Sequence, residues 1–450
     1  MTAPALSFGM SFNDLYDREG LVRLDAAFCG WLKETNAALH ARLMAARTSP
    51  DGLAAKDESN LLIEAARPLE DFVAVLFGVS NEAAALRARH TTLAPLYDCK
   101  RLFVQRYVAR SVKPETAAEE PAIDVGASLA DGVEAWELAF ARKVGALLGA
   151  EFKVGTPTPE IEVLAKYAAW ALHSADGKAR HRDGPLFKLP HKLDFEHLVP
   201  IETEIVDGVT RMRLPRPLLR HREGFALTDR GYDLGRALDH ANYCIWCHNQ
   251  GKDSCSRGLR DRKSGAFQKS PFGVTLAGCP LEEKISEMNL LKSEGFSIGA
   301  LAMAAVDNPL LAATGHRICN DCMKACIYQK QEPVDIPQIE TRTLKDVLGL
   351  PWGFEIYSLL TRWNPLNLRR PLPRPQTGRS VLVVGLGPAG FNLAHHLMND
   401  GHTVVGIDGL KIEPLPADQS GVKADGARVA FAAVKDIALL REDLGERAMA

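Results

Sequence analysis

The sequence predicts a mainly α-helical protein that ends in the first strand–helix–strand unit of a nucleotide-binding α/β fold. Apolar residues recur at helical spacing over the first 240 residues, seven of the nine cysteines lie between residues 244 and 326, and a glycine-rich turn follows an apolar strand near residue 380. A chain of 450 residues is too long for one hydrophobic core. We therefore expect a mainly helical domain of unassigned role over 1–240, a cysteine-rich helical domain over 241–345, a linker over 346–379 and a partial dinucleotide-binding unit over 380–450.

Composition and charge argue against several classes of protein. Hydrophobic residues make up 46% of the chain, charged residues 24%, and the net charge is −2, so no basic excess indicates nucleic acid or an anionic membrane. The N-terminus lacks the pattern of a secretory signal, and no window approaches about eighteen uninterrupted apolar residues. We expect a cytoplasmic protein with no nucleic-acid or membrane partner. In that compartment clustered cysteines bind metal or do redox work rather than form disulfides.

The first 240 residues show two helical blocks. The first carries apolar residues such as Leu21, Leu24 and Phe28, and the second carries Trp136 and Phe140 in the same kind of pattern. A stretch rich in Pro, Glu and Ala over 111–132 predicts an exposed linker between the blocks. Asp207-Gly208, between two short alternating runs, predicts a hairpin turn. Nothing in this region indicates its function.

The cysteines between 244 and 326 fall into two sets. Cys244-x-x-Cys247 places two thiolates close enough to bind one metal centre, and Cys255 joins them if the intervening turn-rich segment folds back. The second set contains the remaining four cysteines, which are Cys279 (followed by Pro280), Cys319, Cys322 and Cys326. Seven thiolates are one short of two complete four-cysteine sites.

Three interpretations of these cysteines compete. A structural zinc site could use Cys244 and Cys247 with Cys319 and Cys322, which would leave the other three cysteines without a role. Seven incidental thiols would not explain two C-x-x-C pairs and a Cys-Pro. Iron–sulfur ligation uses all seven if one cluster takes a non-cysteine ligand, and in two-cluster ferredoxins the cysteine before proline ligates the other cluster. The spacing favours iron–sulfur and leaves zinc open.

The segment from GCPLEEKISEMNLLKSEGF to CNDCMKACIYQKQEPVDIPQIE resembles the N-terminal iron–sulfur domain of the glutamate synthase small subunit, which also occurs in dihydropyrimidine dehydrogenase. The shared features are Gly-Cys-Pro-Leu, Asn-Pro-Leu, Thr-Gly-x-x-Cys, Cys-x-x-x-Cys and Pro-Val-x-Ile-x-x-Ile-Glu. The resemblance implies an α-helical ferredoxin-like domain with two 4Fe–4S clusters and interleaved ligands. It assigns Cys244, Cys247, Cys255 and Cys326 to one cluster. It assigns Cys279, Cys319, Cys322 and an oxygen ligand, Glu340 or otherwise Gln338, to the other.

The sequence departs from this family at the first cluster. Relatives keep the second and third cysteines closer together than Cys247 and Cys255, and they bring the Cys-Pro cysteine soon afterwards. Here the basic, glycine-containing segment 256–278 intervenes. We expect this insertion to be a surface loop.

The segment SVLVVGLGPAGFNLAHHLMNDGHTVVGID predicts a strand, a glycine-rich turn, an amphipathic helix and a second strand. Gly385 makes the tight turn, Gly387 lets the backbone approach a pyrophosphate, and Gly390 lets the helix pack on the strand. The phosphates would lie at the positive end of the helix. Asp408 ends the second strand, where an acidic side chain holds a ribose hydroxyl. The order of the elements predicts a dinucleotide site.

Pro388-Ala389 and His402-Thr403-Val404 make this unit similar to the FAD-binding half of the same family. Relatives continue for several hundred residues and add a second unit for NADPH, whereas this sequence contains about sixty residues after the turn. We expect an incomplete FAD domain, with the NAD(P)H site outside this chain. The resemblance implies the electron-transfer portion of an NAD(P)H-dependent flavin and iron–sulfur oxidoreductase, whose partners are the rest of the flavin domain and an electron acceptor. The alternative is a docking module with structural zinc. We assign no catalytic acid or base.

Overall fold

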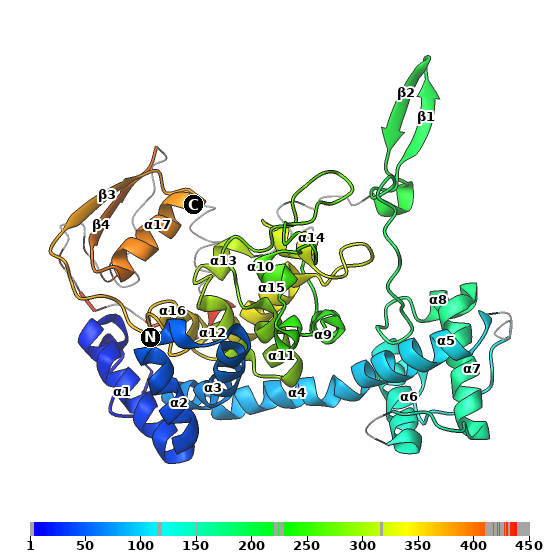
Figure 1. Ribbon diagram of the computed structural model, residues 1–450, viewed down its shortest axis with the longest axis horizontal. Helices are drawn as coiled ribbons and strands as arrows, with labels where there is room; N and C mark the ends of the chain where they lie inside the picture. Colours follow the sequence, from blue (N-terminus) through cyan, green and yellow to red (C-terminus); the bar gives the residue numbers. More distant parts are fainter. Residues whose placement is uncertain are drawn as a thin grey trace.

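The computed structural model describes residues 4–114, 119–149, 152–219, 224, 229–315 and 318–409, and short pieces between 417 and 438. Most of these residues are helical, which agrees with the predicted class (Figure 1). Among the described helices, none combines the length and the apolar character that a membrane span requires. Two hydrophobic cores organise the chain, one at each end of a long helix.

The chain begins with a short turn, η1 (Asn13–Tyr16), and three helices, α1 (Arg18–Thr35), α2 (Ala37–Thr48) and α3 (Ala55–Phe77). The side chain of Asp17 accepts a hydrogen bond from the Gly20 amide and caps α1, and Asn36 caps α2 in the same way. Helix α3 ends at Gly78, which adopts the left-handed conformation common after helices. A short turn, η2 (Pro50–Gly52), separates α2 from α3.

A long helical rod then links the two cores. It consists of α4 (Ser80–Asp98), a π-helical segment η3 (Cys99–Val108) and the short α5 (Ala109–Ser111). Figure 1 shows the rod passing from the side of α3 to the side of α6 and α7. The predicted linker over 111–132 follows it, and the described part of that stretch contains one short turn, η5 (Leu129–Asp131).

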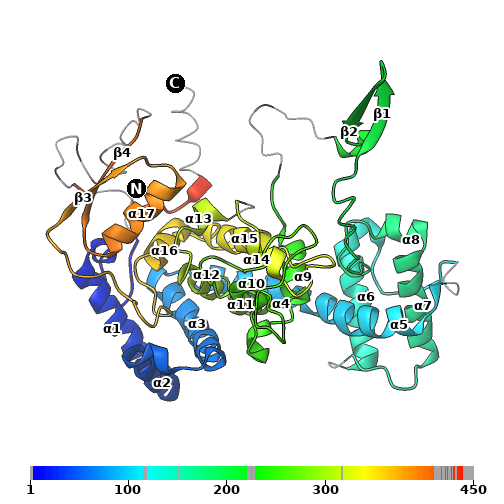
Figure 2. The same ribbon diagram turned by 45° about the horizontal axis from the view of Figure 1, so that its top comes forward.

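The second core lies at the far end of the rod. Helices α6 (Val133–Leu148) and α7 (Pro159–His173) form it with η3, and the short α8 (Ala175–Arg180) follows α7. The largest buried side chains of this core include Phe103, Phe140 and Tyr167. The hairpin of β1 (Glu202–Val206) and β2 (Val209–Arg213) extends away from the body (Figure 2). Its turn is Asp207-Gly208, as predicted. The chain returns through η6 (Arg216–Leu218) and α9 (Leu234–Tyr243).

The first core combines α1–α3 with the cysteine-rich region. The largest helices of that region are α11 (Ile285–Glu294), α12 (Ser297–Ala305) and α15 (Ile336–Leu348). Its shorter elements are η7 (Cys247–Gln250), α10 (Ser254–Arg257), α13 (Leu311–Thr314) and α14 (Asp321–Ala325). Residues from both sides of the predicted domain boundary at residue 240 therefore pack into one core.

The predicted linker over 346–379 is wrong for its first half. Helix α15 continues to Leu348, and a further helix, α16 (Gly353–Leu360), follows it. Trp363, Leu366 and Leu368 after α16 are buried in the first core. The abundant prolines and arginines of the segment suggested a connector, but Trp363 packs against Phe28 of α1 and Phe72 of α3.

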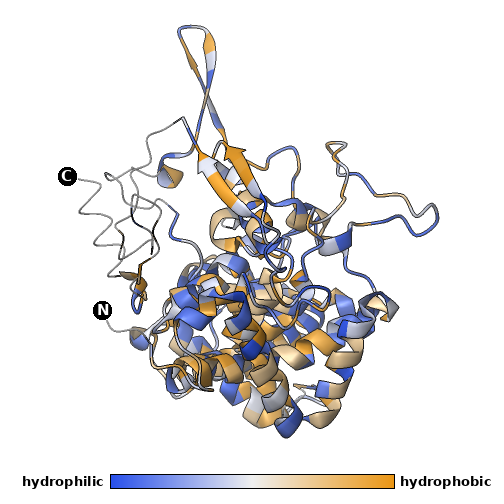
Figure 3. Ribbon diagram, turned by 90° about the vertical axis from the view of Figure 1, so that its left-hand side faces the viewer, coloured by the Kyte–Doolittle hydropathy of each residue, from blue (hydrophilic) through white to orange (hydrophobic). Residues whose placement is uncertain are grey.

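The last described unit is β3 (Ser380–Val384), α17 (Pro388–Asn399) and β4 (Thr403–Ile407). The strands pair in parallel, with Ser380 opposite Thr403 and Val384 opposite Ile407. This is the predicted strand–helix–strand unit. Figure 3 views the molecule from the side of this unit, whose strands carry exposed apolar side chains such as Leu382, Val384 and Val405.

Candidate functional site

Four cysteines form what we call the first cysteine group: Cys244, Cys247, Cys255 and Cys326. Cys244 follows α9, Cys247 begins η7, Cys255 lies in α10 and Cys326 follows α14. Burial raises the pKa of the Cys244 thiol to about 12, and the charges of Cys326 and Cys247 contribute to the rise. Burial and then Asp253 raise the pKa of Cys247 to about 11. These thiols ionise at neutral pH only if a cation compensates their charge, as a metal centre does.

The backbone between Cys244 and Cys247 turns sharply at Trp246. Trp246 adopts a left-handed conformation with φ of +52°, which reverses the chain directly before η7. Its backbone N–H lies 3.4 Å from the Cys244 sulfur and donates a hydrogen bond to it. Such a donor stabilises a thiolate ligand.

Three cysteines and two carboxylates form the second cysteine group: Cys279, Cys319, Cys322, Glu283 and Glu340. Burial raises the pKa of Cys322 well above its ordinary value, and the charges of all four other members add to the rise. Cys279 is half-buried and Cys319 is exposed, so this group reaches the surface. The sequence-predicted ligands of each proposed cluster therefore lie within range of one another's charges.

Glu340 is a buried carboxylate of α15. Only 7% of the residue is exposed, and its side chain makes no hydrogen bond or ion pair with any residue that the structure describes. Burial, followed by the charge of Asp335, raises the pKa of Glu340 to about 8. A buried carboxylate without a partner is costly, and a metal ligand role would offset that cost.

Gln338, the alternative oxygen ligand, is already occupied. Its side-chain oxygen accepts a hydrogen bond of 3.0 Å from the Tyr232 amide. Residues two apart on a helix point to different sides, so Gln338 and Glu340 do not share one direction. The Gln338 oxygen therefore already has a hydrogen-bond donor within the protein.

The insertion over 256–278 folds back on itself. The Leu259 amide donates to the Leu276 carbonyl at 2.9 Å, and Arg260 pairs with Phe267 in a short bridge. At its base the Cys279 amide donates to the Cys255 carbonyl at 2.8 Å. The insertion therefore does not separate the two groups, because the cysteines on either side of it lie next to each other.

The zinc interpretation requires Cys244 and Cys247 to meet Cys319 and Cys322. These two pairs belong to different groups in the structure. Across the part of the chain that is described, no three His, Cys, Asp or Glu side chains are arranged as ligands of one metal ion. Thiolates of a four-iron cluster bind different iron atoms and so lie farther apart than ligands of a single ion.

The glycine-rich turn between β3 and α17 is tightly folded. Gly385 has φ of +90°, and its amide donates to the Ile407 carbonyl at 2.7 Å. A Cβ on Gly390 would lie 1.7 Å from the Gly385 carbonyl oxygen, so only glycine fits there. A Cβ on Gly387 would meet no atom within 4 Å, which leaves room for a ligand at the start of α17.

Asp408 lies directly after β4, as predicted. Its carboxylate accepts a hydrogen bond of 2.6 Å from the Leu386 amide in the glycine-rich turn. A cavity of about 470 Å³ adjoins the turn and is lined by Leu382, Leu393 and the residues between 383 and 390 other than Leu386. The turn, the helix start and the acidic residue are thus brought together.

Sequence reasoning missed two acidic residues beside the cysteines. The Cys255 sulfur donates to the Asp253 carboxylate at 3.0 Å, and burial raises the pKa of Asp253 to about 6. Glu283 is 2% exposed, four residues after Cys279. The sequence Cys-Pro-Leu-Glu-Glu contains this glutamate, but a glutamate at that position does not by itself indicate a metal ligand.

Comparisons with known proteins place the chain among bacterial relatives. A family model described as the RP005 N-terminal alpha-helical domain matches residues 6–78. The uncharacterized protein RP005 of Rickettsia prowazekii is 30% identical over 305 residues, which are 64% of this chain and 98% of RP005. The uncharacterized protein RP006 of the same organism is 64% identical over 106 residues, which are 24% of this chain and 15% of RP006.

The chain also has a more distant similarity to a glutamate synthase subunit. The NADPH glutamate synthase small chain of Mycobacterium tuberculosis is 35% identical over 128 residues, which are 28% of this chain and 23% of that protein. The chain thus spans about a quarter of the glutamate synthase small chain and less of RP006. No solved structure matches it. This partial similarity supports a distant relationship between the chain and the glutamate synthase small chain.

Proposed function

The chain belongs to the family of the Rickettsia prowazekii protein RP005, and we propose that it is the electron-transfer portion of an NAD(P)H-dependent flavin and iron–sulfur oxidoreductase. The observation that carries this proposal is that charges within two adjacent groups of cysteines act on one another, with the buried Glu340 acting on the second group. The distant similarity to an NADPH glutamate synthase small chain supports the same class.

In this proposal each cysteine group holds one 4Fe–4S cluster, which supplies one-electron transfer. The first group buries three of its four thiols, which limits contact with water. The Trp246 amide donates to the Cys244 sulfur, and Glu340 adds an oxygen ligand to the second group. Hydrogen bonds and ligand charge are the means by which a protein sets a cluster potential.

The glycine-rich turn would bind the pyrophosphate of FAD. Gly387 leaves space at the start of α17, where backbone amides face an anion, and Asp408 lies beside the turn. The exposed apolar side chains of β3 and β4 would be covered by the rest of the flavin domain. The NAD(P)H site and the electron acceptor would belong to other parts of the enzyme.

Iron analysis tests the proposal. Full-length protein purified without oxygen should be brown and contain about eight iron atoms per chain. Cys244→Ser and Cys279→Ser remove a ligand from different groups, so each should lose about half of the iron and the double variant nearly all of it. Cys29→Ser is the matched control and should keep the full amount, because Cys29 lies on α1 outside both groups.

Two results would overturn the proposal. One is folded, colourless protein without iron after oxygen-free purification, and the other is full iron content in both single variants. Zinc in place of iron in the purified protein would support the docking module instead.

A further inference from the structure

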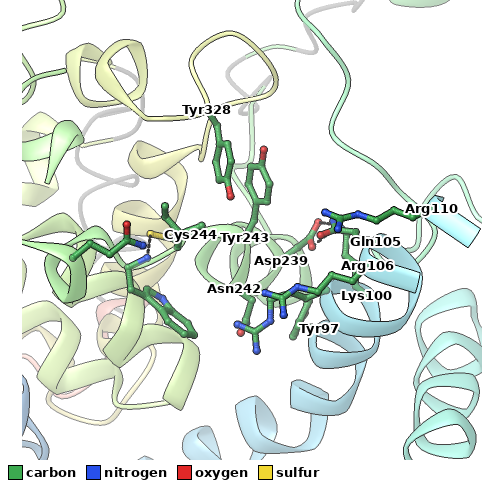
Figure 4. A pocket seen from close by; sticks show the side chains of 14 residues that line it. Tyr97, Lys100, Gln105, Arg106, Arg110, Asp239, Asn242, Tyr243, Cys244 and Tyr328 are labelled. Atoms are coloured by element: carbon green, nitrogen blue, oxygen red, sulfur yellow. Dashed lines mark hydrogen bonds and ion pairs between the residues drawn. The ribbon is translucent and has the colours of Figure 1, made fainter. Parts of the chain in front are cut away.

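A cavity of about 480 Å³ lies beside Cys244, between the π-helical segment η3 and helix α9. Figure 4 shows Lys100, Arg106 and Arg110 on one side of it and Cys244 on the other. Its volume is in the range of sites for small organic ligands. The side chains that line it are mainly basic, amide and aromatic: Tyr97, Lys100, Arg101, Gln105, Arg106, Arg110, Asn242, Tyr243, Trp246, Gln250 and Tyr328, with Asp239, Cys244 and Ile245.

The π-helical geometry of η3 gathers the basic residues on one face. In an α-helix, residues five apart point about 140° away from each other. In a π-helix the hydrogen bonds run from i to i+5, so residues five apart lie near the same face. Within η3, Lys100 and Gln105 follow this spacing, as do Arg101 and Arg106, and Arg110 lies in α5, two residues beyond the end of η3. Uncommon helical geometry thus coincides with the row of polar side chains that line the cavity.

Two of the four cations have no ion-pair partner among the described residues. Lys100 forms an ion pair of 2.6 Å with Asp239, and Arg101 forms one of 3.1 Å with Asp98. Arg106 and Arg110 are exposed and have no ion pair or hydrogen-bond partner among the residues that the structure describes. Two guanidinium groups at one cavity suit a dianion, and the planar guanidinium matches a phosphate in a bidentate way.

Aromatic rings occupy the opposite part of the lining. Tyr243 and Tyr328 stack with their ring centroids 4.5 Å apart, and the Arg101 guanidinium lies 5.7 Å from the Trp246 ring. Rings of this kind contact planar ligands, whereas free inorganic phosphate would leave most of the volume unfilled.

We infer that the cavity binds a nucleoside monophosphate, which is a phosphate monoester that carries a planar base. The phosphate carries a charge of about −2 and binds Arg106 and Arg110. The base lies toward Tyr243, Tyr328 and Trp246. A ligand held there lies next to Cys244 of the first cysteine group. The site is separate from the glycine-rich turn, and its binding does not depend on the proposed electron-transfer function.

Calorimetric titration of the full-length protein with AMP tests this inference. Binding should weaken at least tenfold in Arg106→Ala and in Arg110→Ala, and also on raising the salt concentration. Arg89→Ala is the matched control, because Arg89 is an exposed arginine of α4 that does not line the cavity. Adenosine and inorganic phosphate, titrated separately, measure the contributions of the ring and of the charge, and each should bind at least tenfold more weakly than AMP.

The inference fails if AMP does not bind at millimolar concentration, or if Arg106→Ala and Arg110→Ala bind it as well as Arg89→Ala does. Phosphate binding as tight as that of AMP would overturn the assignment of a planar ligand. Circular dichroism of each variant separates loss of binding from loss of fold. Since the titration needs no iron, its failure would leave the iron–sulfur proposal standing, and the reverse also holds.

Discussion

His90 is a buried histidine in α4 that contacts a charged network of the first core. Its Nδ1–H donates to the Leu86 carbonyl at 2.8 Å, and its Nε2 lies 4.0 Å from the Asp346 carboxylate. Asp346 is already paired with Lys292 and Arg342. Burial, followed by the charge of Lys292, lowers the pKa of His90 to about 4. The ring is therefore neutral in the folded protein at neutral pH.

This neutral histidine makes the free energy of unfolding depend on pH. An unfolded histidine binds its proton near pH 6.5, so below that pH the unfolded state holds more protons and the folded state loses stability until about pH 4. Between pH 7 and pH 5 the loss from His90 is about 2 kcal/mol. Urea unfolding should show a pH difference smaller by about that amount in His90→Asn. Equal pH dependence in His90→Asn, the wild type and the exposed-residue control His191→Asn would contradict this expectation.

At the scale of the element, the insertion over 256–278 depends on two glycines at its base. Gly278 has φ of +85°, and a Cβ there would lie 2.5 Å from the Gly258 amide nitrogen and 2.7 Å from the Ser256 carbonyl oxygen. A side chain would push these two backbone segments apart. The contact between the Cys279 amide and the Cys255 carbonyl would open with them.

We therefore expect Gly278→Ala to lower the iron content of both cysteine groups and to lower the melting temperature. Gly273→Ala is the matched control within the same insertion, because Gly273 has φ of +75° but a Cβ there would meet nothing within 4 Å. It should cost only the backbone strain, about 1–2 kcal/mol. Iron content and thermal unfolding measure both effects. Equal iron in the two variants would show that the base of the insertion does not hold the groups together.

The elements that the sequence predicts well are those fixed by local pattern. The unit from Ser380 to Ile407 follows the prediction, because strand, turn and helix each have their own signal. The π-helical geometry of Cys99–Val108 has no distinct sequence pattern, and the helix Gly353–Leu360 was hidden by a proline-rich context. Both depend on packing against distant residues. A single sequence does not reveal such contacts.

The candidate site, like the fold, could be predicted from the sequence only in part. The resemblance supplied the assignment of Cys244 and Cys326 to one cluster and of Cys279 and Cys322 to the other, and this assignment stays a prediction. The charges that raise the pKa of Cys244 and of Cys322 come from residues of the same set in each case. The hydrogen bond that distinguishes Gln338 from Glu340 joins Gln338 to Tyr232, 106 positions away in the sequence, so no local pattern indicates it. The basic cavity was not predictable, because its lining comes from segments more than 100 residues apart.

At the scale of the whole molecule, two hydrophobic cores share one continuous helical rod. Phe72 of α3 is fully buried in the first core, where it contacts Phe28 and Trp363. Phe140 of α6 is fully buried in the second core, where it contacts Phe103. All seven cysteines of the two groups lie in the cysteine-rich region that packs with the first core.

Separate cores need not unfold in one step, and the iron-binding groups should depend on one of them. Phe140→Ala and Phe72→Ala each remove a buried aromatic ring and should each cost about 3–5 kcal/mol. We expect scanning calorimetry to show two transitions, with each substitution lowering mainly one of them. Because the cysteines lie with the first core, Phe72→Ala should reduce the iron content and Phe140→Ala should leave most of it. A single transition that both variants shift equally would show instead that the rod couples the cores into one cooperative unit, and iron would then be lost from both.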